Sequence, residues 1–239
     1  MDKTQPSKPL FTLPFLTLTV LFVVCLIIAN LVEIKTVSLG AVTVTAGLAV
    51  FPLSYIINDC IVEVYGFRRA RLAIWLGFAM SLLTAVMLNI AIWLPGGDEW
   101  QSQEAMEAIY GSVPRIMLAS FAAFICGSMV NAYVMSRMKR TAATATSGAT
   151  WRFSLRAIVS TLWGEGVDSL IFFPVAFGGI LPTSTIISLI ISQALLKTLY
   201  EILVLPVTVA VVKRLKRIEG EDTTDSASTD YSWWRLTDI

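Results

Sequence analysis

Histidine is absent from the 239-residue sequence, and charged side chains make up only 15% of it. Without histidine the chain lacks the commonest transition-metal ligand and the commonest proton carrier at neutral pH. A soluble domain is about 25% charged, whereas this sequence is 56% apolar. The net charge of +1 also excludes a strongly basic face of the kind that binds nucleic acid. The composition therefore predicts a membrane protein with no metal site and no nucleic-acid partner.

Cysteine is also scarce. Cys25, Cys60 and Cys126 each lie inside an apolar stretch, and no C-x-x-C spacing occurs. This arrangement favours buried structural thiols over a metal knuckle or a redox pair. We expect no cofactor.

The apolar residues are gathered into six runs, each long enough to cross a bilayer core of about 30 Å as a helix. The runs cover residues 13–32, 45–64, 72–94, 113–134, 157–180 and 185–212. Lysine and arginine gather before the first run and after the second, fourth and sixth, and are nearly absent from the other connections. By the positive-inside rule, this alternation places both termini in the cytoplasm.

We therefore predict an all-α membrane protein with six transmembrane helices in one domain, residues 13–215. A cytoplasmic N-terminal segment (1–12) precedes this domain, and a disordered cytoplasmic tail (216–239) follows it. After the first helix, the alternating segment 36–44 predicts a short hairpin or re-entrant piece around Gly40, and a plain loop fits equally well. In the stretch 160–179, Gly164, Gly166 and Pro174 flank two acids, which is typical of a broken helix at a transporter site.

Ionisable groups inside membrane helices each cost several kcal/mol unless they are paired or hydrated, so they mark candidate functional sites. Seven such groups occur: Asp59, Glu63, Arg115, Glu165, Asp168, Lys197 and Glu201. Asp168 and Lys197 each lie about 18 Å along sequential antiparallel helices, which predicts an ion pair near the midplane. That pair alone is also compatible with a structural staple. Asp59 and Glu63 are compatible with a structural cluster around the arginines that follow them.

Neutral side chains on the same helices complete the candidate set: Asn30, Asn58, Trp163, Ser169, Phe172 and Gln193. Carboxylate oxygens accept hydrogen bonds from adjacent N–H groups of a heterocycle while its ring stacks on an aromatic face. A planar aromatic ligand would suit this composition, although aromatic residues more often serve packing or face lipid.

The sequence resembles the queuosine precursor transporters, also called the vitamin uptake transporter family, six-helix proteins of the bacterial inner membrane. The resemblance covers essentially residues 13 to 215. It is carried by Asn30 and by the segments FPLSYIINDCIVEVYGFRRAR (51–71), PRIMLASFAAFICG (114–127), STLWGEGVDSLIFF (160–173) and KTLYEILVLPVT (197–208). It implies matching polar positions at Asn30, Asp59, Arg115, Asp168 and Lys197.

The resemblance further implies import of 7-cyano-7-deazaguanine or 7-aminomethyl-7-deazaguanine for the salvage of queuosine in tRNA. We expect Glu165 or Asp168 to accept both N–H groups of the guanine-like edge. Asp59, Glu63 and Glu201 are candidates for ion coupling or gating. The expected partners are a purine-like small molecule and the lipid bilayer, with assembly into a homodimer left open.

Two other classes of protein fit the sequence less well than a secondary transporter. A substrate-binding membrane subunit that depends on a separate ATPase complex ranks lower, because no small-residue docking face stands out on the first helix. An intramembrane enzyme is disfavoured because the sequence has neither H-E-x-x-H nor G-x-S-x-G.

Overall fold

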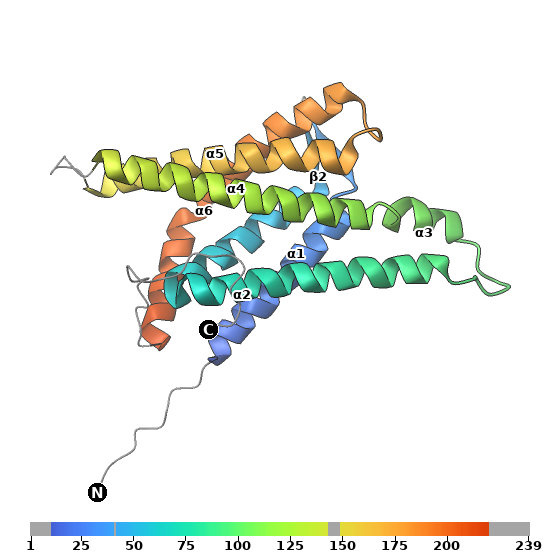
Figure 1. Cartoon of the computed structure of the whole chain (residues 1–239), viewed down its shortest axis with the longest axis horizontal. Helices are drawn as coiled ribbons and strands as arrows, with labels where there is room; N and C mark the ends of the chain where they lie inside the picture. Colours follow the sequence, from blue (N-terminus) through green and yellow to red (C-terminus); the bar gives the residue numbers. More distant parts are fainter. Residues whose placement is uncertain (1–10, 41, 143–148, 220–239) are drawn as a thin grey trace, which may run out of the picture.

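The computed structural model describes residues 11–40, 42–142 and 149–219. The chain runs through α1 (Leu13–Val32), β1 (Thr36–Leu39), β2 (Val42–Thr45), the 3₁₀ turn η1 (Ala46–Ala49), α2 (Phe51–Trp93), α3 (Gln103–Tyr110), α4 (Val113–Ala142), α5 (Ala149–Phe177) and α6 (Thr183–Glu219). The fold is therefore predominantly helical, as predicted (Figure 1). The predictions for residues 1–10, 143–148 and 220–239 lie outside the described residues.

Five helices of the described chain are long and apolar enough to cross a membrane. They are Leu13–Val32, Arg68–Trp93, Gln103–Asn131, Ile158–Phe177 and Thr183–Glu219. Large apolar side chains such as Leu170, Leu195 and Leu203 are exposed on their surfaces, as expected where lipid is the solvent. The chain is a multi-pass helical membrane protein.

The remaining predicted span corresponds to the first arm of α2. Gly66 has φ 80° and ψ 169°, and this non-helical residue divides α2 into the arms 51–65 and 67–93. Glycine adopts positive φ without steric cost. Figure 1 shows the two arms diverging from this bend as a V. The first arm is shorter than the predicted run 45–64, because Thr45 ends β2 and residues 46–49 form η1. Pro52, in the first turn of α2, favours a helix that starts at this point.

The hairpin predicted around Gly40 is confirmed. Strands β1 and β2 pair antiparallel, with Thr36 opposite Thr45 and Leu39 opposite Val42. Gly40 has φ 65°, a left-handed conformation that suits the turn. The hairpin packs against α6, where Ser192 Oγ donates to the carbonyl of Thr43 at 2.6 Å. The fold is thus not purely helical.

The prediction of a broken helix at 160–179 is wrong, because α5 is continuous through Pro174 to Phe177. Gly164 in this stretch serves close packing against α4 instead. A Cβ atom added to Gly127 of α4 would lie 2.8 Å from the carbonyl oxygen of Gly164. The two helices approach at these glycines, and α5 has no need to unwind.

The last helix, α6, continues to Glu219, four residues beyond the predicted end of the domain at 215. The Glu219 carboxylate accepts hydrogen bonds from Thr12 Oγ1 at 2.6 Å and from Tyr65 Oη at 2.7 Å. These contacts fix the end of α6 beside the start of α1 and the bend of α2. Both ends of the described chain therefore lie on the same side of the bundle.

Candidate functional site

The centre of the bundle holds a buried group of charges on α5 and α6. Lys197 Nζ lies 3.0 Å from Asp168 Oδ2 and 3.4 Å from Glu165 Oε2. The predicted ion pair between Asp168 and Lys197 is confirmed, and Glu165 extends it to a triad. Both acids are less than a tenth exposed. The ammonium also lies 4.7 Å from the centre of the Phe51 ring on α2, a distance typical of a cation–π contact.

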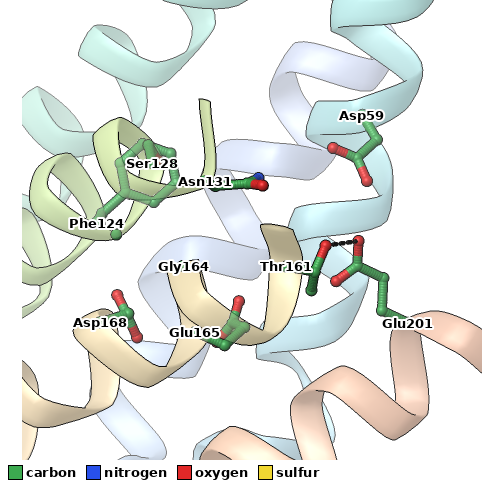
Figure 2. Close-up of a pocket in the computed structure, with 10 residues that line it drawn as sticks. Asp59, Phe124, Ser128, Asn131, Thr161, Gly164, Glu165, Asp168 and Glu201 are labelled. Atoms are coloured by element: carbon green, nitrogen blue, oxygen red, sulfur yellow. Dashed lines mark hydrogen bonds between the residues drawn. The ribbon is translucent and has the colours of Figure 1, made fainter. Parts of the chain in front are cut away.

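A pocket of about 60 Å³ opens beside this triad. Its lining comes from α2, α4, α5 and α6: Asp59, Phe124, Gly127, Ser128, Asn131, Thr161, Gly164, Glu165, Asp168 and Glu201. Figure 2 shows Asp59 and Glu201 facing α5 from neighbouring helices, with Thr161 donating to Glu201 Oε1 at 3.2 Å. A cavity of this size holds a few water molecules, so a larger ligand requires the helices to separate.

The pocket is rich in hydrogen-bond acceptors. Four carboxyl groups line it, from Asp59, Glu165, Asp168 and Glu201, and Lys197 pairs with two of them. Adjacent carboxylate oxygens match pairs of N–H donors on a planar ligand. Among the described residues no group of three or more His, Cys, Asp or Glu side chains has the arrangement of a metal site.

A second polar group lies where the hairpin meets α1 and α6, and we call Glu33, Thr45 and Gln193 the hairpin cluster. Thr45 Oγ1 donates to Glu33 Oε1 at 2.7 Å and accepts from Gln193 Nε2. All three side chains are buried. Burial raises the pKa of Glu33 to about 7, although the Thr45 hydroxyl and the positive charge of Lys197 act to lower it.

The structure gathers some of the predicted site residues and separates others. Asp59, Glu165, Asp168 and Glu201 line the pocket, and Lys197 joins them through the triad. Ser169, Phe172 and Gln193 are buried on α5 and α6 outside the pocket lining, and the buried Asn30 donates to the carbonyl of Leu26 at 2.9 Å. Asn58, next to Asp59, is partly buried outside the lining, and its Oδ1 has no hydrogen-bond partner among the described residues.

Three of the predicted residues lie away from the pocket. The Arg115 guanidinium donates to the carbonyls of Val175 and Gly178, each at 2.6 Å, and so caps the end of α5. The Trp163 side chain is 61% exposed and turned out of the bundle. Glu63 pairs with Lys216 at 2.7 Å near the end of α6.

The structure adds Ser128 and Thr161 to the pocket, and Glu33 and Thr45 to the hairpin cluster, which the sequence analysis did not predict as site residues. Helical spacing contained a signal for the first group, because Thr161 precedes Glu165 by four residues and Ser128 precedes Asn131 by three. For Glu33 no such signal exists, since it stands one residue beyond α1 and only the folded hairpin buries it.

Comparison with known proteins places these observations in a family. The family described as "Putative vitamin uptake transporter" matches residues 45–211. The chain is 35% identical to the "Probable queuosine precursor transporter" of Bacillus subtilis, over 80% of this chain and 81% of that protein. It is 27% identical to the "Queuosine precursor transporter" of Escherichia coli, over 74% and 72% of the two chains.

A third relative, the "Probable queuosine precursor transporter" of Haemophilus influenzae, is 25% identical over 61% of this chain and 59% of its own length. No solved structure matches the chain.

Proposed function

The chain belongs to the queuosine precursor transporter family, so it is a membrane transporter and not an enzyme, and we propose that it imports 7-cyano-7-deazaguanine or 7-aminomethyl-7-deazaguanine. In this proposal the imported base feeds the salvage of queuosine in tRNA, and the protein acts as a secondary transporter in the bacterial inner membrane.

The main support for the substrate assignment is the pocket beside the triad, which four carboxyl groups make rich in hydrogen-bond acceptors. The guanine-like edge of a deazaguanine presents a ring N–H and an exocyclic amine side by side. Glu165 or Asp168 accepts both in a bidentate arrangement that an adenine-like edge cannot reproduce. Lys197 lies 3.4 Å from Glu165 and 3.0 Å from Asp168, so its positive charge is placed to balance the acids. For Asn30, Asn58, Arg115, Trp163, Ser169, Phe172 and Gln193, a direct role in binding stays a prediction.

Transport then requires the pocket to open alternately to each side. We propose six membrane crossings, with the arm 51–65 of α2 as the second and both termini in the cytoplasm. The contact between Thr12 and Glu219 supports this topology, because it joins the start of α1 to the end of α6. The pocket of about 60 Å³ is smaller than a binding site for a purine-like base, so binding of such a base requires the helices around the pocket to separate. Asp59, Glu63 and Glu201 are the candidates for ion coupling or gating.

The test is queuosine formation in a bacterial strain that cannot make the precursor and lacks its own transporter. Supplied with a deazaguanine base, cells expressing this protein should form queuosine in tRNA, and cells expressing Asp168→Asn at the same membrane level should not. The exposed Glu107→Gln is the matched control and should behave as wild type. Full queuosine formation by Asp168→Asn would overturn the site assignment.

The family resemblance leaves the source of energy open, and a substrate-binding subunit served by a separate ATPase is the alternative. Uptake of labelled base by liposomes that contain only the purified protein distinguishes the two. We expect uptake without ATP, whereas a strict requirement for ATP and added subunits would support the alternative.

A further inference from the structure

Glu33 is a buried carboxyl group to which the proposed substrate site assigns no role. Glu33 is 4% exposed and lies at the junction of α1 and the hairpin. One carboxyl oxygen accepts the Thr45 hydroxyl at 2.7 Å. The other, Oε2, has no hydrogen-bond partner among the described residues. A buried polar atom without a partner is costly, so its presence calls for a reason.

The surroundings of Glu33 contain little opposing charge. Within the described part of the chain, no lysine or arginine forms an ion pair with it. The charged groups that act on it from the packed elements are Lys197 of α6 and Asp168 of α5, which pair with each other. Thr45 of β2 and Gly47 of η1 are uncharged, and Lys35, two residues along the chain, is exposed. An ionised carboxylate is therefore poorly compensated here, whereas a protonated one costs little.

The backbone beside Glu33 is shaped to hold its carboxyl group. A Cβ atom added to Gly47 would lie 1.5 Å from Glu33 Oε2 and 3.2 Å from the carbonyl oxygen of Ala29. The absence of a side chain at Gly47 thus provides the space that the carboxyl group fills. When the hairpin and η1 pack against α1, they enclose Glu33 and remove it from water.

A directed chain of hydrogen bonds connects Glu33 to α6, the helix that carries Lys197 of the triad. The Gln193 amide donates to the Thr45 hydroxyl, which donates to Glu33. Gln193 and Lys197 are four residues apart on α6 and share a helix face. A change in the protonation of Glu33 that alters the contact between the hairpin and α6 would therefore act at Gln193. This residue lies one helical turn from Lys197.

We propose that Glu33 binds the proton that drives transport, and that the hairpin closes over it when the proton is bound. The step is a simple protonation: the carboxylate takes one proton from water on the hairpin side and becomes a carboxylic acid, with no other bond formed or broken. Closure buries the neutral form readily and the ionised form only at a large cost. The inference rests on the proposed function, since it names the ion that powers the same transport.

The experiment uses the full chain in liposomes, with labelled 7-cyano-7-deazaguanine, an imposed pH gradient and the membrane potential held at zero. One proton per neutral base gives about tenfold accumulation for each pH unit. Wild type should approach that ratio. Glu33→Gln, which resembles the protonated acid, should reach a ratio of about one while still exchanging external label for base loaded inside the liposomes. Glu107→Gln should accumulate base as wild type does.

The outcomes separate the two claims. Absence of exchange in the wild type would contradict the proposed function itself. Two results would overturn the role of Glu33. In the first, the wild type exchanges base but its accumulation does not depend on the pH gradient. In the second, the pH gradient drives accumulation by Glu33→Gln to the same ratio as in wild type.

Thr45→Val provides a second variant that keeps the carboxyl group. Loss of the hydroxyl donor disfavours the ionised form, so the pH midpoint of driven uptake should move upward. A merely structural role for Glu33 predicts an unchanged midpoint, and that result would also overturn the inference.

Discussion

Asp168 and Glu33 are both buried carboxyl groups close to α6, but they are held in opposite ways. Asp168 lies 3.0 Å from Lys197, and its charge is matched by a cation. Glu33 is held by a hydroxyl and faces a glycine. A carboxylate beside a cation has its charge balanced and can bind the polar edge of a ligand. A carboxyl group with neutral partners is free to gain and lose a proton. The contrast suggests a division of labour between the triad and the hairpin cluster.

Removal of the cation should have the largest effect. Lys197→Met leaves Asp168 and Glu165 buried without their partner, which should cost about 3–5 kcal/mol of stability. The change is measured as the loss of thermal or denaturant stability of the purified protein in detergent. Lys216→Met is the matched control, because its partner Glu63 is 62% exposed, and it should cost about 1 kcal/mol or less. Equal losses in the two variants would show that the triad is not a charge-balanced unit.

The pH dependence of stability should reveal Glu33 next. Its pKa is raised from 4.5 to about 7 in the folded protein, so its contribution to stability is complete below pH 4.5 and is lost as the pH rises to 7. The loss amounts to about 3 kcal/mol. The measurement is the free energy of unfolding of wild type minus that of Glu33→Gln at each pH from 4.5 to 7. Taking this difference cancels the contributions of the other titratable groups. A difference that stays constant with pH would contradict this prediction.

A smaller effect is expected from filling the space beside Glu33. Gly47→Ala places a methyl group where Glu33 Oε2 lies and should cost about 1–3 kcal/mol through overpacking. In a Glu33→Ala background the carboxyl group is gone, so the same change should cost much less. The double-mutant cycle measures this coupling. Additive costs would mean that the carboxyl group does not occupy the space above Gly47.

The sequence was sufficient to predict the apolar helices and the ion pair. The lengths of the apolar runs predict the helices, and the rise per residue places Asp168 and Lys197 at the same depth. The glycines were harder to interpret. Gly66 bends α2, whereas Gly164 lets α4 approach α5. Which of these two roles a glycine has depends on whether another helix packs against it, and the local sequence does not specify that.

The hairpin cluster was beyond prediction for a related reason. Glu33 follows its helix by one residue and looks like an ordinary loop acid. Its burial depends on Thr45, twelve residues later, and on Gln193 from the last helix. Neither the hydrophobic pattern nor the local charge pattern carries information about contacts of this kind.

The most direct test of this division of labour is the affinity of the purified protein for a deazaguanine base at pH 7, compared between two variants. Asp168→Asn removes a charged acceptor from the proposed site and should weaken binding about tenfold or more. Glu33→Gln leaves the pocket intact and should bind within about threefold of wild type. The reverse pattern, with normal binding by Asp168→Asn and weak binding by Glu33→Gln, would contradict the account.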